Sequence, residues 1–370
     1  MIRSCIHFGA GALGRGLVVP RLVEAGWSVV VVDPLHDLLD TLRRAGGYPL
    51  ELRDAKGPHR VWIPVAAALH PQRDKSAIAA HLGEAPLVTT AVRKENLATT
   101  VRQLAAAWMD GMPERVAVVG CENVERVDAV LDAAFADTAL SPDRRARIAL
   151  PRTVVDRICA STWPADTAIR TEPYTELAAS TTGMDLPGID MARDIDAVFD
   201  RKRYLVNTLA DAAAILGLAR GYTLLSEAFG DDDLLGDLAP LVAVLKQHLV
   251  LLHGFEPRDL DAYAETSRHR LADTFIPRRL DTVARDIWRK MQPSERFFAP
   301  MIDLERRGRL DDPAAIDVMA RLVILGDGSS YGPADIAPRL RGMAEGGSEA
   351  TRAVYGAVAA RTAVVGSRPI

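Results

Sequence analysis

The sequence predicts an α/β protein with a doubly wound parallel sheet at its N-terminus, followed by a mostly α-helical C-terminal region. Short, continuously apolar runs alternate with helical patterns over the first half of the 370 residues. A glycine-rich turn follows the first of these runs directly. After about residue 190 the β-branched runs stop and helical stretches follow one another. We therefore expect one domain at 1–190 and a helical second domain at 191–370.

Each element follows from its local pattern. Strands are expected at 2–8, 28–33, 60–65, 87–92 and 115–119, because these short apolar runs suit a sheet covered on both faces. Helical periodicity between the strands predicts helices up to about residue 25 and at 34–44, 94–109 and 123–136. In the second domain, glycines and prolines separate expected helices at 194–217, 222–229, 237–254, 258–271, 296–306, 312–326 and 347–362.

Composition excludes several classes of protein. Lys and Arg number 45 against 49 Asp and Glu, so the chain has no excess of positive charge of the kind that binds nucleic acid or an anionic membrane. The three cysteines form no Cys-x-x-Cys pair and there is no His-Glu-x-x-His, so neither a disulfide framework nor a metal site is expected. The most apolar stretch, 238–252, carries Lys246 and His248, and no membrane span is expected. The cytoplasm is the expected location, because no signal peptide is recognisable.

The strongest local motif is Gly9-Ala10-Gly11-Ala12-Leu13-Gly14, which follows a strand and opens a helix. Gly9 permits the tight turn, Gly11 allows the backbone to approach a pyrophosphate, and Gly14 allows close packing of helix and strand. The helix N-terminus faces the phosphate charge. The motif therefore predicts a dinucleotide site of the Rossmann type, with Gly9, Ala10, Gly11, Leu13 and Gly14 as binding residues.

Asp33 ends the second strand, 19 residues after Gly14, where a carboxylate accepts the ribose hydroxyls of NAD. It would repel the 2′-phosphate of NADP, and no arginine follows it directly, so NAD is the expected cofactor. Thr89 and Thr90 end a further strand beside the cofactor crevice. Contact with the cofactor and simple β-propensity explain these two threonines equally well.

Lysine is rare enough that one with a chemical role should be easy to find. The six lysines are Lys56, Lys75, Lys94, Lys202, Lys246 and Lys290. In an α-helix, Lys202 and Asn207 would lie about 140° apart, on one broad face that could offer an ammonium and an amide to one oxygen. Asn123 follows a strand at the end where such sheets place ligands. From the spacing alone, a solvated lysine is the simpler interpretation.

Several stretches together resemble one family. They are His7-Phe8-Gly9-Ala10-Gly11 with Gly14-Arg15-Gly16, Thr89-Thr90-Ala91-Val92, Cys121-Glu122-Asn123, Val155-Asp156-Arg157-Ile158, Glu172-x-Tyr174-x-Glu176, Lys202 with Asn207, and Arg285-x-x-x-Arg289-Lys290-Met291. In this order, over about residues 1–310, the chain resembles the polyol-specific long-chain dehydrogenases. The similarity is greatest to their shorter branch, the mannitol-1-phosphate 5-dehydrogenases.

The resemblance implies a Rossmann domain, a helical substrate domain and metal-independent hydride transfer with NAD. It assigns general acid/base catalysis to Lys202, hydrogen bonds with the reacting oxygen to Asn207 and Asn123, and a place near the substrate to Lys290. Arg285 and Arg289, in the same stretch, are expected near the substrate too. An arginine cluster here would suit a phosphate, although a solvated basic face explains it equally well.

The chain departs from the family pattern at several positions. Ala210 stands where the family has a histidine that helps to position the substrate, Arg93-Lys94 replace Gly-Pro, Leu177 replaces Trp, and Ile287 replaces Pro. The expected activity is interconversion of a secondary alcohol and a ketone on a polyol phosphate or related sugar derivative. The alternatives are a dehydrogenase of a cyclitol or sugar acid in a biosynthetic pathway, or a non-catalytic NAD-binding sensor. The expected partner is a polyol, sugar phosphate or cyclitol, and the expected assembly is a monomer or small homo-oligomer.

Overall fold

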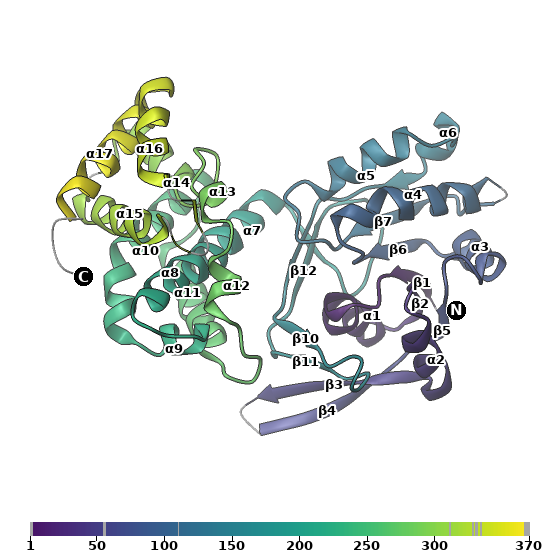
Figure 1. Cartoon of the computed structure of the whole chain (residues 1–370). Coiled ribbons are helices and arrows are strands. Elements are labelled where there is room, and N and C mark those ends of the chain that lie inside the picture. Colours follow the sequence, from purple (N-terminus) through teal and green to yellow (C-terminus); the bar gives the residue numbers. More distant parts are fainter. Residues whose placement is uncertain are drawn as a thin grey trace. The chain divides into compact units, whose positions relative to one another are not determined.

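The chain forms two compact units, Met1–Phe199 and Asp200–Ile370 (Figure 1). The structure is a computed structural model that describes residues 3–54, 57–109, 111–310, 312–327, 329, 332–333 and 335–365. Ile2, the first residue of the first expected strand, and Lys56 lie outside the described residues. The border between the units falls within helix α7 (Ile195–Lys202), whereas the sequence analysis places the domain border at residue 190.

A six-stranded sheet forms the centre of the N-terminal unit. Its order is β5-β2-β1-β6-β7-β8, and every neighbouring pair is parallel. The strands are β1 (Arg3–Phe8), β2 (Trp27–Val32), β5 (Ala67–Leu69), β6 (Leu87–Thr90), β7 (Val116–Gly120) and β8 (Ile148–Ala149). The chain runs outward in one direction from β1 and in the other from β6. The carboxyl ends of β1 and β6 therefore form the switch point where open parallel sheets bind ligands.

Helices cover both faces of this sheet, which confirms the predicted doubly wound class. Successive strand residues alternate between two cores: Val29 and Val31 of β2 join one, whereas Val30 and Val32 join the other. The first core includes η1 (Gly14–Val18), α1 (Val19–Glu24) and α2 (His36–Ala45). The second includes α3 (Lys75–Glu84), α4 (Lys94–Trp108) and α5 (Val127–Ala136). The short α6 (Pro142–Arg145) precedes β8.

The expected strand at 60–65 is not part of the parallel sheet, and this prediction was wrong. It lies in β4 (Gly57–Pro64), which pairs antiparallel with β3 (Gly47–Asp54), and β5 takes its place beside β2. Because Val61 and Trp62 are exposed, this apolar run is not covered on both faces. The hairpin belongs to a four-stranded sheet with β10 (Cys159–Ser161) and β11 (Ile169–Thr171). A third sheet holds β9 (Thr153–Asp156), β12 (Glu176–Ser180) and β13 (Asp190–Ala192).

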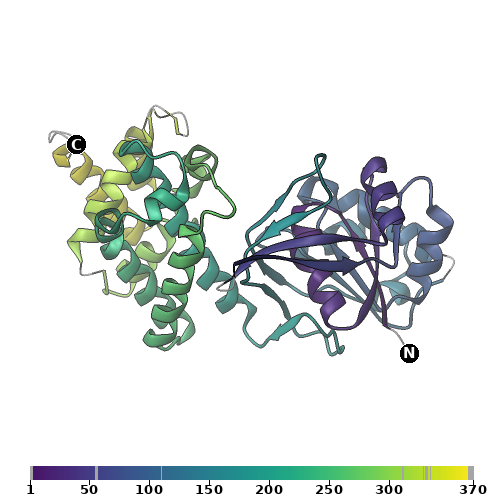
Figure 2. The same cartoon turned by 90° about the horizontal axis from the view of Figure 1, so that it is seen from below.

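The C-terminal unit is helical, as predicted (Figure 2). Its described elements after α7 are η2 (Arg203–Thr208), α8 (Leu209–Ala219), α9 (Leu225–Phe229), α10 (Asp232–His253), α11 (Pro257–Ala272), α12 (Leu280–Ala284), α13 (Ile287–Lys290), α14 (Ala299–Arg306), α15 (Pro313–Gly326), α16 (Ile336–Gly346) and α17 (Glu349–Val365). The helices α12, α13 and α16 lie outside the stretches predicted to be helical. For α12 and α13 the reason is their length, because a helix of about one turn shows no periodicity.

Helix α10 is long and apolar enough to cross a membrane by length and composition, with a mean hydropathy of 1.5. Core helices of folded domains pass the same test, and α10 packs against α8, α14 and α15 within its own unit. Its ends are defined as in globular proteins. The Asp231 side chain accepts the Leu234 N–H at 3.0 Å, and Gly254 follows the last turn with a φ of 69°.

Candidate active site

The glycine-rich turn follows β1 and has the geometry that the sequence predicts. Gly9 has a φ of 106°, and a side chain there would collide with the Ala91 backbone. A side chain at Gly14 would collide with the Gly9 carbonyl and the His7 ring. Gly11, in contrast, is exposed with open space around its missing Cβ, so a ligand can approach the backbone there. Leu13 caps the first helical turn and packs its side chain against the core.

Asp33 holds the glycine turn as well as facing the cofactor edge of the sheet. Its carboxylate is 7% exposed and accepts the Ala10 N–H at 2.6 Å and the Leu35 N–H at 2.8 Å. Each carboxylate oxygen has a second lone pair. The predicted contact with ribose hydroxyls is therefore compatible with these bonds, and it stays a prediction.

His7 supports the turn from beneath, a role that the sequence analysis did not assign. Its Nε2 lies 2.9 Å from the Gly9 carbonyl and its Nδ1 lies 2.7 Å from Thr89 Oγ1. Burial lowers the pKa of His7 to about 4, so the ring is neutral at pH 7. Because the Gly9 carbonyl only accepts, Nε2 carries the proton and Nδ1 accepts from the Thr89 hydroxyl.

A buried arginine supports the turn from its other side. Arg15 is 1% exposed, and its guanidinium donates to the carbonyls of Ala10, at 2.7 Å, and Thr167, at 2.5 Å. The Tyr48 hydroxyl donates to the Arg15 carbonyl at 2.6 Å. The small sheet that contains β3 therefore anchors the glycine turn. The only sequence signal for this role was the Gly-Arg-Gly of the resemblance.

The two threonines at the end of β6 are fully buried, and they form hydrogen bonds within the protein. Thr89 bonds with His7, and Thr90 donates to Glu122 Oε2 at 3.0 Å. Glu122 Oε1 also accepts the Val92 N–H at 2.9 Å. Burial raises the pKa of Glu122. Glu122 thus joins the ends of β6 and β7, and the exposed Asn123 follows it, three residues after the last residue of β7 at the carboxyl edge of the sheet.

In the C-terminal unit, a π-helical segment extends over Arg203–Thr208. Lys202 immediately precedes this segment and Asn207 lies within it. The expected α-helix, with Lys202 and Asn207 about 140° apart, is therefore wrong at this position. In a π-helix the hydrogen bond joins residues five apart, so Lys202 and Asn207 lie about one turn apart on one side of the helix. The Thr208 hydroxyl, which donates to the Arg203 carbonyl at 2.9 Å, supports this local geometry. Lys202 is 8% exposed and Asn207 is half-buried.

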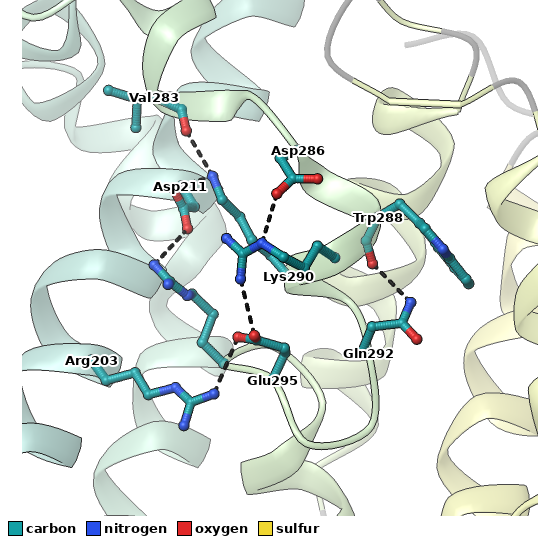
Figure 3. Close-up of polar contacts among 10 residues, drawn as sticks. Arg203, Asp211, Val283, Asp286, Trp288, Lys290, Gln292 and Glu295 are labelled. Atoms are coloured by element: carbon teal, nitrogen blue, oxygen red, sulfur yellow. Dashed lines mark hydrogen bonds and ion pairs between the residues drawn. The ribbon is translucent and has the colours of Figure 1, made fainter. Parts of the chain in front are cut away.

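Lys290 lies in an ion cluster that joins α13 to α8 (Figure 3). Its ammonium donates to Asp211 Oδ1 at 2.9 Å and to the Val283 carbonyl at 2.8 Å, and Arg296 donates to Asp211 Oδ2 at 3.2 Å. Burial lowers the pKa of Lys290 and raises that of Asp211, and each charge opposes the shift of the other. The charge of Lys290 is thus compensated within the protein by Asp211, a partner that no local sequence signal indicates.

The arginines near Lys290 are mostly paired as well. Arg289 donates to Asp286 at 2.6 Å and to Glu295 at 3.0 Å. Arg203 also donates to Glu295, at 3.1 Å. Arg285 is exposed and has no hydrogen bond or ion pair with another described residue. Of the three predicted substrate residues, Arg285 is therefore the one whose charge is not already compensated.

The predicted residues fall into two groups, one in each unit. Gly9 to Gly14, Asp33, Thr89, Thr90 and Asn123 cluster at the carboxyl ends of neighbouring strands in the N-terminal unit. Lys202, Asn207, Lys290, Arg289 and Arg285 belong to the helical unit. No group of three or more His, Cys, Asp or Glu side chains that could hold a metal occurs among the described residues.

Comparison with known proteins gives consistent matches. Residues 3–191 match the family model described as the mannitol dehydrogenase Rossmann domain. A mannitol-1-phosphate 5-dehydrogenase of Arthrobacter sp. (strain FB24) is 30% identical over 318 residues, 82% of each chain. The Lactiplantibacillus plantarum enzyme of the same name is 28% identical over 335 residues, 86% of this chain and 85% of that one.

Solved structures show the same fold. The Pseudomonas fluorescens mannitol 2-dehydrogenase, in a ternary complex with NAD and D-mannitol, gives a TM-score of 0.71 at 16% identity, covering 99% of this chain and 92% of that chain. A substrate-free D-sorbitol dehydrogenase gives a TM-score of 0.73 at 15% identity, covering 98% and 93%. With the glycine turn, the doubly wound sheet and the family match over residues 3–191, the chain belongs to the mannitol dehydrogenase family of oxidoreductases.

Proposed function

We propose that this protein interconverts a secondary alcohol and a ketone on a polyol phosphate, with Lys202 as general acid/base. The general activity, that of an NAD-dependent polyol dehydrogenase, follows from its family. The residue role and the phosphorylated substrate are our proposal. The observation that supports the role of Lys202 most is the π-helical turn, because it brings a buried ammonium and an amide to one side of a helix. Single π-helical turns are frequent at functional sites.

The chemistry needs a group that moves a proton at the reacting oxygen. In the oxidation direction, neutral Lys202 Nζ takes the hydroxyl proton while the carbon–oxygen double bond forms. NAD, when bound, accepts the hydride that leaves the same carbon. In reduction, protonated Lys202 returns the proton to the developing alkoxide. Asn207 donates its amide N–H to that oxygen, a fixed dipole that favours the negative charge.

The relatives support a phosphorylated polyol as the substrate, since they are named mannitol-1-phosphate 5-dehydrogenases. A second candidate is a cyclitol or sugar acid. It is favoured by the buried Ala210 in place of the family histidine, and by the pairing of Lys290 and Arg289 with carboxylates. A substrate panel decides between them: NAD-dependent oxidation of polyols, their 1-phosphates, cyclitols and sugar acids, measured as NADH formation. A phosphate preference supports the first candidate, and turnover restricted to cyclitols or sugar acids supports the second.

The role of Lys202 is tested on the best substrate of that panel. Lys202→Ala should lower kcat by roughly 10²–10⁴-fold, because a positioned acid/base contributes about that factor. The affinity for NADH should stay nearly unchanged, since the glycine turn belongs to the other unit. Added methylamine should restore part of the lost rate by occupying the space of the removed amine. Lys246→Ala is the matched control, because Lys246 forms an outer ion pair with Asp261. Near-normal kcat in Lys202→Ala would refute the assignment.

The remaining alternative, a sensor that binds NAD without turnover, has its own signature. Such a protein would bind NADH but oxidise no member of the panel.

The three free cysteines also support the proposal that the protein works in a reducing cytoplasm.

A further inference from the structure

Arg93 has a backbone conformation that few residues other than glycine adopt. Among the described residues, only Arg93 and Asp286 combine a side chain with a positive φ. Asp286, at φ 60° and ψ 38°, lies in the left-handed helical region, which aspartate tolerates. Arg93, at φ 70° and ψ 152°, lies in a region that is essentially restricted to glycine. Such strain persists where the surroundings fix the backbone, and it concentrates at functional sites.

The surroundings of Arg93 are the cofactor turn itself. The chain enters Arg93 from β6, and the Ala91 N–H donates to the Phe8 carbonyl at 2.7 Å. Ala91 and Val92 close the space beside Gly9, so this segment touches the glycine turn directly. Glu122 holds the Val92 N–H from the other side. Arg93 then caps the 15-residue helix α4. The backbone on both sides of Arg93 is therefore fixed beside the glycine turn.

The side chain of Arg93 has charge to offer a ligand. It is exposed, and within the part of the chain that the structure describes it forms no hydrogen bond or ion pair. Many other arginines, such as Arg43 and Arg60, are paired with carboxylates. The strain at Arg93 therefore brings no compensating side-chain contact among the described residues, and the guanidinium is free to bind an anionic ligand at the glycine turn.

We propose that Arg93 binds the diphosphate of the dinucleotide on the glycine turn. The order of the strands places Arg93 apart from the expected position of the adenosine ribose, because Asp33 follows β2 on one side of β1 and Arg93 follows β6 on the other. The anionic groups expected at the turn are the two phosphates, and a guanidinium binds phosphate oxygens through paired N–H groups. This inference rests on the proposed function in one respect, that NAD is the cofactor.

Three variants separate the charge of Arg93 from its strain. Arg93→Gly removes both, Arg93→Gln removes the charge and keeps the strain, and Arg93→Lys keeps both. Arg102→Gln is the control for net charge, because Arg102 is an exposed arginine on the same helix α4, where it donates to Thr99. The measurements are the dissociation constants of NADH, ADP-ribose and adenosine by calorimetry, and the thermal unfolding midpoint of each full-length variant without ligand.

We expect Arg93→Gly and Arg93→Gln to weaken NADH and ADP-ribose about tenfold, which corresponds to about 1.4 kcal/mol. Adenosine, which has no phosphate, should bind each variant alike, and the loss should shrink at high salt. Arg93→Lys and Arg102→Gln should stay within about threefold of the parent, at most about half of that loss in free energy. Arg93→Gly alone should raise the unfolding midpoint, by about 2–4 °C.

The outcomes distinguish this inference from the proposed function. If Arg93→Gly unfolds at a higher temperature but binds NADH and ADP-ribose like the parent, the strain is structural and the inference is wrong. Equal losses for adenosine and ADP-ribose would also overturn it, because they would mean a general distortion of the site. If the unaltered protein does not bind NADH at all, the proposed function fails together with the inference.

Discussion

His7 shows how one buried ring organises the cofactor turn. It lies on β1, yet it bonds with the glycine turn through Gly9 and with β6 through Thr89. Both bonds need the neutral ring with its proton on Nε2. A second proton on Nδ1 would face the Thr89 oxygen, which would have to reverse its own bond, and a buried charge would remain without a counter-ion. The geometry of the turn therefore depends on the protonation state of a single side chain.

The burial of His7 predicts how stability depends on pH. Because its pKa is about 4 in the folded state and about 6.5 when unfolded, the unfolded chain binds the extra proton between these values. The stabilisation is full above pH 6.5 and falls as the pH drops towards 4, by about 3 kcal/mol in total. Urea unfolding of the parent and of His7→Gln, at several pH values, should show that the variant lacks this part of the slope.

The comparison with His7→Gln is needed because Glu122 acts in the opposite direction. Burial raises its pKa, so its contribution to stability falls as the pH rises. If His7→Gln keeps the full slope of the parent between pH 4 and 6.5, the ring is not the group that titrates, and its neutral state in the fold would need another explanation.

At the scale of elements, the Asp211–Lys290 ion pair joins the helix after the π-helical turn to the short helix α13. The lysine and aspartate side chains are 7% and 6% exposed, and Arg296 adds a second cation to the same carboxylate. Breaking a buried pair by removing one partner leaves an uncompensated charge, and this typically costs about 3–5 kcal/mol. Lys246 and Asp261, with side chains 26% and 66% exposed, form the matched outer pair.

A double-mutant cycle tests this pair. Asp211→Leu should lower the free energy of unfolding by about 3–5 kcal/mol, because two cations lose their carboxylate. Lys290→Met should cost less, since Arg296 still pairs with Asp211. The double variant should be more stable than the sum of the single effects predicts, by about 1–3 kcal/mol, and Lys246→Met should change stability by about 1 kcal/mol or less. Additive effects at Asp211 and Lys290 would mean that the ion pair is energetically unimportant.

The sequence predicted the elements whose patterns are long and local. The strands β1, β2, β6 and β7, the glycine turn and the helices α10, α11 and α15 all have clear local sequence signals, and the structure confirms them. The β3–β4 hairpin was misjudged because Val61 and Trp62 are apolar but exposed, and an apolar run by itself does not say how many faces are covered. One-turn helices such as α13 are too short to show a period.

The sequence predicted those site residues whose role is set by their close neighbours in the chain. It did not predict residues whose role depends on a partner that is distant in the sequence. Gly9, Gly11 and Gly14 could be recognised, because a turn needs them at fixed spacing. The π-helical turn could not, since the same letters fit an α-helix. Asp211 lies 79 residues from Lys290, so nothing local indicates their ion pair. His7 and Arg15 could be recognised from the sequence only as members of a family motif, and their hydrogen bonds with the glycine turn became clear only from the structure.

At the scale of the whole molecule, the role that we propose for Lys202 predicts a reaction that needs no metal ion. In the proposed mechanism Lys202 transfers the proton, a step that a metal-bound water would otherwise assist, and the described residues offer no cluster of three metal ligands. Activity with NAD should therefore persist after prolonged dialysis against EDTA. The check is the steady-state rate before and after dialysis, with a parallel measurement of metal content. Loss of activity that zinc restores would contradict the mechanism.

The burial of two lysines has a practical consequence for handling the enzyme. Amine-reactive supports and cross-linkers acylate exposed amines, and Lys202 and Lys290 are 8% and 5% exposed. Among the lysines that the structure describes, Lys75 and Lys94 are the exposed ones, on the outer helix α3 and at the start of α4. Among the described lysines, a resin would therefore react first with those of the dinucleotide-binding unit and leave the amine that we propose for proton transfer unmodified. Replacing Lys94 by arginine would direct the attachment to α3, away from the glycine turn.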